Sequence, residues 1–189
     1  MSDALIALHF QNDICHPDGA IPFSLNRNTP EAEAFLAASR KALAAARRKR
    51  WTIAHVHIGF AKDYSDLPRN SRLFRKAEQF HAVRRGSWGA AAYKGFEART
   101  GEIVITRPCN SAFYNTTLEA RLRRRKVDTL HVMGMATQFS VESTVRAASD
   151  MNYRVVILAD CCASADMDAH RASLKTLAML ADIKGGPSG

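Results

Sequence analysis

The chain has 189 residues, 47% of them hydrophobic and 24% charged, a balance typical of one folded globular domain and not of a disordered chain. Lysine and arginine outnumber aspartate and glutamate by 27 to 18, so the formal net charge is +9. No apolar stretch approaches the roughly 20 residues that a membrane-spanning helix needs, and the first residues lack the basic start of a signal peptide, so we expect a cytoplasmic protein without a membrane partner.

Strands and helices are predicted to alternate from the start of the chain. Residues 4–9 form an apolar run that is typical of a buried strand. A helix is expected over 29–50, because Thr29 can cap it and Pro30 suits its first position. Residues 51–58 then alternate in polarity, which predicts a second strand.

The middle of the chain is less regular. A helix is expected around 71–82, and the apolar residues of 102–107 predict a third strand. The helix expected over 116–126 carries a capping-box pair, Thr116 with Glu119.

The last third of the chain returns to regular alternation. Strands are expected at 129–134 and 154–160, and helices at 140–151 and 168–182. Residues 1–184 are therefore predicted to form one domain. The final GGPSG, residues 185–189, is expected to be a flexible tail.

Apolar strands that alternate with helices predict a parallel sheet covered on both faces, a three-layer α/β/α sandwich with a mostly parallel, Rossmann-like central sheet. Such sheets bind ligands beyond the carboxyl ends of their strands. This rule brings together His9, Arg107 and the loop 134–140. Ser140 starts a predicted helix, and two interpretations stay open: an N-cap, or a nucleophile beside unpaired backbone N–H groups.

Two basic runs, RRKR at 47–50 and RLRRRK at 121–126, hold much of the excess positive charge. Such runs are typical either of a surface for nucleic acid or another acidic partner, or of solvated helix ends. Neither run has interleaved aromatic residues that stack on bases. Both precede strands, so they lie at the edge opposite the expected pocket, and we expect no nucleic-acid partner.

Four segments carry a more specific pattern: ALIALHFQNDICHPDG (4–19), ITRPCNSAFYNTTLEARL (105–122), VMGMATQFSVESTVRAASDMNYRVVILADCCAS (132–164) and HRASLKTLAMLADI (170–183). In sequence and spacing they resemble the isochorismatase-like, or cysteine hydrolase, superfamily. The resemblance covers nearly the whole domain. It implies the same fold, a small-molecule substrate and assembly as a homodimer or homotetramer.

The usual chemistry of this superfamily uses an aspartate, a lysine and a nucleophilic cysteine. Carried over by position, the aspartate is replaced by His9, the lysine by Arg107 and the cysteine by Ser140. The resemblance also implies a non-proline cis peptide between Met135 and Ala136. The backbone N–H groups of Ala136 and Ser140 would then be the oxyanion donors.

These substitutions leave three interpretations open. In the first, His9 is the general base for a Ser140 nucleophile that hydrolyses a C–N or ester bond, with Arg107 as electrostatic support and Asp13 as the candidate acid that orients His9. In the second, a protonated His9 cleaves a vinyl ether, as isochorismatases do. In the third, catalysis is lost and the pocket binds a small anionic ligand.

The remaining candidates have weaker signals. Gln11 and Phe113 are expected to bind substrate, together with Met135 and Ala136. Nicotinamidases of this superfamily bind a metal near the positions of His55 and His57, but their aspartate is absent here, so we expect no metal and no cofactor. Cys109 is an alternative, displaced nucleophile. Phe60 and Trp88 are expected to line the pocket or a subunit contact, and the four cysteines are expected to stay reduced.

Overall fold

The structure is a computed structural model that describes residues 2–185. Six strands form one sheet in the order β3-β2-β1-β4-β5-β6, and each neighbouring pair is parallel. The fold class predicted from the sequence is therefore confirmed. The strands are β1 (Ser2–Leu8), β2 (Thr52–Ile58), β3 (Ile103–Arg107), β4 (Val127–Met135), β5 (Arg154–Ala163) and β6 (Asp182–Lys184).

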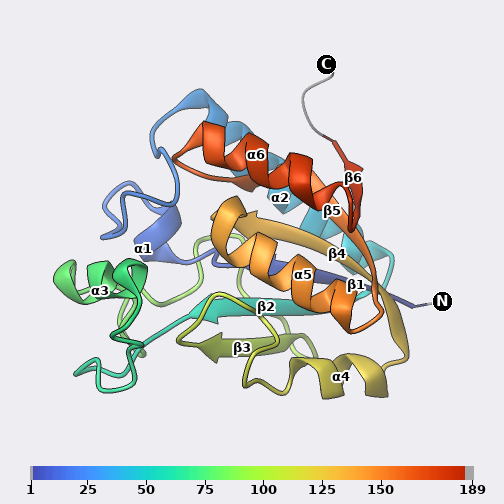
Figure 1. The fold of residues 1–189 in the computed structure, drawn as a ribbon, viewed down its shortest axis with the longest axis horizontal. Helices are drawn as coiled ribbons and strands as arrows, with labels where there is room; N and C mark the ends of the chain where they lie inside the picture. Colours follow the sequence, from blue (N-terminus) through green and yellow to red (C-terminus); the bar gives the residue numbers. More distant parts are fainter. Residues whose placement is uncertain (1, 186–189) are drawn as a thin grey trace.

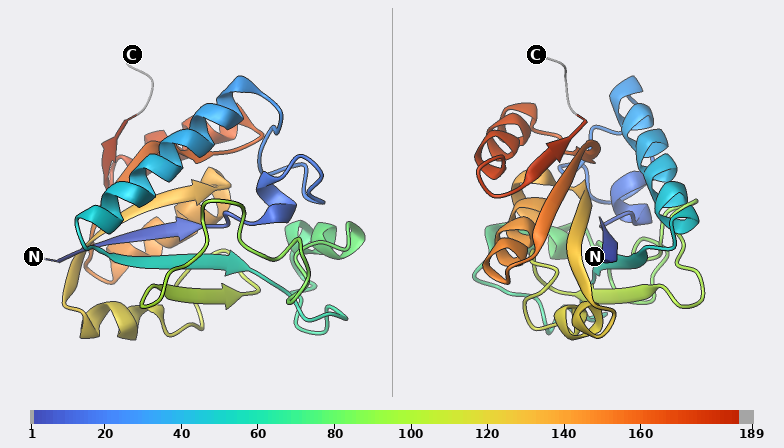
Figure 2. Two further views of the ribbon diagram at one scale, coloured as in Figure 1. Left: turned by 180° about the vertical axis from the view of Figure 1, so that it is seen from behind. Right: turned by 90° about the vertical axis from the view of Figure 1, so that its right-hand side faces the viewer.

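Helices cover both faces of the sheet, as Figures 1 and 2 show. One face carries α1 (Asn12–Cys15), α2 (Pro30–Arg48) and α3 (Arg72–Gln79), and the other carries α4 (Leu118–Arg124), α5 (Glu142–Asp150) and α6 (Met167–Leu177). A short π-helix, η1 (Thr137–Val141), runs directly into α5. No helix in residues 2–185 is long and apolar enough to cross a membrane.

The central strand β1 explains why this chain forms a covered parallel sheet. Its residues 4–8 are entirely buried, because β1 lies between β2 and β4 and helices pack on both of its faces. The strand order reverses between β1 and β4. The loops that leave these two strands diverge at that point and open a crevice at the carboxyl edge of the sheet.

Several predicted element boundaries agree with the structure and others differ by a few residues. Thr29 caps α2 and accepts the Ala32 N–H at 3.2 Å, as predicted. The predicted capping box is wrong, because the Thr116 hydroxyl donates to Ala112 O and α4 begins only at Leu118.

The last predicted helix is also too long. In the structure α6 ends at Leu177, and residues 182–184 then pair as β6 with residues 156–158 of β5. The three residues of β6 are too few for a polarity pattern to show. Of the predicted tail, residues 186–189 lie outside the described part of the chain.

Candidate active site

A small cavity of about 50 Å³ lies at the carboxyl ends of β1 and β4, at the predicted edge of the sheet. His9 follows β1, Met135 ends β4, and Ala136 and Ser140 follow it. All four line the cavity. The rest of the wall is mainly apolar and comes from the end of β2, from η1, and from loops and helices on the α1 and α3 side: Ile14, Ile21, Phe23, Ile58, Phe60, Leu73, Phe74, Ala77, Val83 and Phe139, with Ser24 and Asn110 as further polar residues.

His9 sits at the first turn out of the sheet. Its backbone has φ +64°, and its N–H donates to Val56 O at 2.9 Å, which holds the residue against β2. The side chain is only 3% exposed. Its Nε2 lies 3.4 Å from Nη2 of Arg107, and Nδ1 has no hydrogen-bond partner among residues 2–185.

The contact with Arg107 assigns the tautomer of His9. A guanidinium only donates hydrogen bonds, so Nε2 must accept, and the proton of the neutral ring resides on Nδ1. Burial lowers the pKa of His9 well below 6.5, and the charges of Arg107 and His57 lower it further, against an opposing contribution from Gln11. At neutral pH the ring is therefore uncharged, and its Nδ1–H is a donor without an acceptor.

Arg107 ends β3 and is 2% exposed, a rare degree of burial for a cation. Its guanidinium donates to the backbone carbonyls of Cys109 and Asn110 as well as facing His9. Burial lowers the pKa of Arg107 to about 10, so it stays charged at neutral pH. Among residues 2–185 it forms no ion pair with a carboxylate, and its side chain does not line the cavity.

Ser140 lies inside the π-helix η1, whose N-cap is Ala136, so the N-cap interpretation of Ser140 is wrong. Its backbone N–H donates to Ala136 O at 3.1 Å and is engaged in this conformation. In the described part of the chain, no hydrogen bond joins the Ser140 hydroxyl to the His9 imidazole. The peptide bond between Met135 and Ala136 is cis, as the family resemblance implied.

Three residues that the sequence singled out have structural roles. The Gln11 amide exchanges hydrogen bonds with the backbone of Ile58 at 2.9 Å in both directions, so it clamps β2 and does not line the cavity. Phe113 is buried in the core on the α4 and α5 side, where it stacks on Tyr153. The Asp13 carboxylate accepts backbone N–H groups and does not orient His9.

Cys109, the alternative nucleophile, lies outside the cavity. Its thiol contacts the carbonyls of Ser111 and Tyr114, burial raises its pKa, and it does not line the cavity. Trp88 is 54% exposed and lies outside the cavity, whereas Phe60 lines it as expected.

The histidines of β2 do not fit a metal centre. His55 Nε2 lies 2.8 Å from the Glu102 carboxylate, which Arg47 also engages, so this nitrogen is already occupied. Residues 2–185 contain no group of three or more histidine, cysteine, aspartate or glutamate side chains arranged to hold a metal ion.

Three residues that close the cavity were not predicted from the sequence: Phe23 and Asn110 from loops, and Phe139 from η1. Asn110 follows the end of β3 by three residues, so its place near the carboxyl edge of the sheet was the one signal that could have found it. Phe23 belongs to a loop of irregular structure, where no periodicity reports which side chain faces inward.

The buried histidines predict a pH-dependent stability. Burial, assisted by the charge of His55, lowers the pKa of His57 from 6.5 to about 4, so the unfolded chain binds this proton first as the pH falls. The contribution to stability is complete above pH 6.5 and is lost between pH 6.5 and about 4. Urea unfolding is expected to show a free energy of unfolding that falls as the pH is lowered from 6.5 to about 4. The dependence of this free energy on pH is expected to be weaker in His57→Gln. An identical slope in the variant would contradict the assignment.

Known proteins resemble this chain in both sequence and fold. The family model for the isochorismatase domain matches residues 3–184. Ureidoacrylate amidohydrolase RutB from Methylobacterium radiotolerans is 30% identical over 189 residues, covering 92% of this chain and 72% of that protein. The uncharacterized isochorismatase family protein YecD of Escherichia coli O157:H7 is 29% identical, covering 83% and 80%. The crystal structure of an isochorismatase family protein from Desulfovibrio vulgaris superposes with a TM-score of 0.84 at 26% identity, covering 96% and 93%.

Proposed function

Because this chain belongs to the isochorismatase family, we propose that its cavity binds a small organic anion, a carboxylate with a compact apolar body. His9, Arg107 and Ser140 take the positions of the aspartate, lysine and cysteine of that family. In this arrangement His9 is a hydrogen-bond donor to the ligand and neither a base nor an acid.

The observation that carries the proposal is a buried cation without a counter-ion. Arg107 has no carboxylate partner within residues 2–185, although an uncompensated buried charge is unfavourable. Its donor bond to His9 polarises the ring, and the Nδ1–H then donates to a ligand carboxylate. The negative charge of the ligand would offset the charge of Arg107 through the imidazole. The apolar wall of the cavity fits the body of such a ligand.

The same geometry weighs against the vinyl-ether interpretation. That reaction needs a proton donor, and a ring whose pKa lies well below 6.5 carries no imidazolium proton at neutral pH. A general-base role for His9 is also opposed, because deprotonated Nδ1 requires a proton on Nε2, facing the Arg107 N–H.

Hydrolysis of an amide or ester by Ser140 is the second candidate. It is favoured by the position of Ser140 and Ala136 on one cavity wall beside the cis peptide, and by the amidohydrolase activity that names the relative RutB. A rotation of the Ser140 side chain on substrate binding would have to create the hydrogen bond to His9. Both candidate functions include a small-molecule partner and self-association of the chain as a homodimer or homotetramer.

A titration followed by NMR separates the candidates. Propionate is expected to bind about tenfold more tightly than its neutral isostere propionamide, because a charge-assisted hydrogen bond replaces a neutral one. His9→Phe is expected to abolish this preference, and Ser140→Ala is expected to keep it. Equal affinities for the two probes would contradict the binding proposal.

The hydrolytic alternative is tested on a panel of amides, ureides and esters. Turnover by the unmodified protein that disappears in both Ser140→Ala and His9→Ala would establish Ser140 as the nucleophile and overturn the binding-only proposal. Absence of turnover from the whole panel, together with the preference for propionate, is the result that we expect.

A further inference from the structure

Two adjoining hollows lie away from the active-site cavity: the first between the second half of α2 and residues 95–99, the second at the opposite edge of the sheet beside the starts of β2 and β3. Their volumes are about 410 and 380 Å³, and they share Arg47 and Arg99 as walls. The seven residues of β2 separate this edge from the active-site cavity, which corresponds to about 20 Å. Five arginines line the two hollows together: Arg40, Arg47, Arg48, Arg99 and Arg125.

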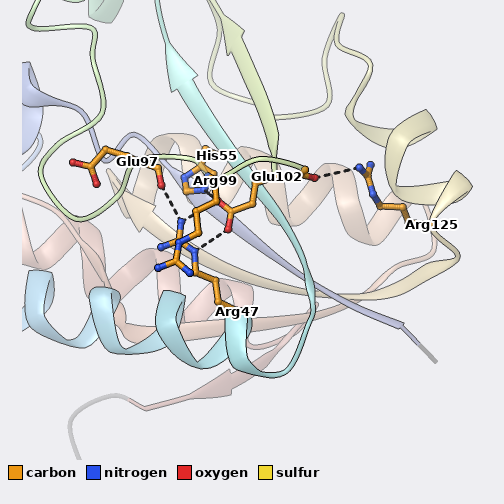
Figure 3. Close-up of polar contacts among 7 residues, drawn as sticks. Arg47, His55, Glu97, Arg99, Glu102 and Arg125 are labelled. Carbon is orange, nitrogen blue, oxygen red and sulfur yellow. Dashed lines mark hydrogen bonds and ion pairs between the residues drawn. The ribbon is translucent and has the colours of Figure 1, made fainter.

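Arg47 forms the fixed centre of this basic groove. Its guanidinium donates to both oxygens of Glu102, at 2.8 and 2.9 Å, and to Glu97 O at 2.9 Å, as Figure 3 shows. Hydrogen bonds from Arg47, from the Arg99 backbone and from His55 lower the pKa of Glu102 to about 2, despite its partial burial. Glu102 is therefore a permanent carboxylate that positions Arg47 and neutralises one positive charge.

Arg40 lies on the wall of the first hollow and packs on two aromatic rings. Its guanidinium lies 5.5 Å from the ring centroid of Tyr93 and 5.3 Å from that of Phe96, and it donates to Lys94 O. Gly95 has φ +90°, and a Cβ there would come within 2.8 Å of Arg40 Nε. The turn at Gly95 thus leaves space for the Arg40 side chain.

The other three arginines form no ion pair with a carboxylate within residues 2–185. Arg48 and Arg99 are exposed, and neither side chain has an ion-pair partner within residues 2–185. Arg125 donates only to Gly101 O, at 3.5 Å (Figure 3). The walls therefore present five guanidinium groups and the Glu102 carboxylate, and the Glu97 carboxylate lies beside the first hollow, where it accepts the Gly95 N–H.

We propose that this basic groove binds a compact polyanion that carries several phosphate groups. A concave wall of like charges raises the local concentration of anions. All five cations are arginines, whose planar fork donates two hydrogen bonds to one phosphate, and none is the more flexible lysine.

A nucleic acid fits the groove less well than a compact polyphosphate. Trp51, the aromatic residue of the second hollow, stacks on His131 with ring centroids 4.1 Å apart, and Lys49 Nζ lies 4.9 Å from its ring centroid. Its ring is therefore engaged and is not free to stack on a base, as proteins that bind single strands require.

Calorimetric titration with inorganic tripolyphosphate at constant ionic strength tests the proposal. We expect one tripolyphosphate bound per chain, more tightly than orthophosphate, and at least about tenfold weaker binding to the double variant Arg48→Gln/Arg99→Gln. The matched control is Arg72→Gln, an exposed arginine of α3 that lines neither hollow, and it is expected to bind as the unmodified chain does. Both altered positions are exposed, so the thermal unfolding temperature is expected to stay unchanged.

Two results would overturn the proposal. One is an affinity for tripolyphosphate that is the same in the double variant and in Arg72→Gln. The other is a single-stranded oligonucleotide that binds more tightly than tripolyphosphate and depends on the same two arginines, because the groove would then be a nucleic-acid surface. Neither result depends on what the active-site cavity binds.

Discussion

Replacing Gly134 by alanine is expected to lower the free energy of unfolding by about 3 kcal/mol or more. Gly134 lies in β4 with φ +132°, and it pairs with Leu8 of β1. An added Cβ would come within 2.2 Å of Leu8 O and 2.7 Å of Leu8 Cβ. Both contacts are to a central strand that cannot move without disturbing the sheet, so strain and steric overlap add.

Chemical denaturation with a matched glycine variant checks this expectation. Gly101 has φ +89° but no atom within 4 Å of an added Cβ, so Gly101→Ala carries the backbone strain without the overlap. We expect it to lose about 1 kcal/mol. Equal losses in the two variants would show that the close approach of β1 and β4 at Gly134 is not as described.

Replacing Arg107 by methionine is expected to destabilise the fold by about 2–4 kcal/mol. The substitution keeps most of the buried volume but removes the donor to the carbonyls of Cys109 and Asn110 and to His9 Nε2. Relief from burying the charge offsets part of this loss. Because Arg107 also lowers the pKa of His9, the pKa of His9 is expected to rise in the variant.

Urea unfolding and an NMR titration of His9 measure the two effects. Arg84→Met is the control, since Arg84 is exposed, and it is expected to change stability by less than about 0.5 kcal/mol. If Arg107→Met were as stable as this control and left the pKa of His9 unmoved, Arg107 would not be the residue that holds His9.

The sheet and the edge that carries the site were predictable from the sequence because they depend on strong, local patterns. Buried parallel strands are apolar runs, and ligands of such sheets bind at the carboxyl edge. His9 and Ser140 could therefore be placed at the same edge from the sequence alone. The prediction identified the end of β3 as well, where Arg107 contacts His9.

The orientation of individual polar side chains was not predictable in the same way. Gln11 and Asp13 both follow β1, but their side chains bond to backbone that is distant in the chain, at Ile58 of β2 and at Val83. Such contacts span 47 and 70 residues and leave no trace in local spacing. The sequence predicts Ser140 in the first turn of an α-helix, whereas the structure has a π-helical turn there, because polarity patterns do not distinguish the two.

The protonation state of His9 tests the account most directly. A long-range ¹⁵N–¹H correlation spectrum of the imidazole at pH 7 reports which nitrogen carries the proton. We predict a neutral ring with the proton on Nδ1 and an unprotonated Nε2 that accepts from Arg107. A proton on Nε2, or an imidazolium at this pH, would contradict the assignment of His9 as a ligand donor held by Arg107.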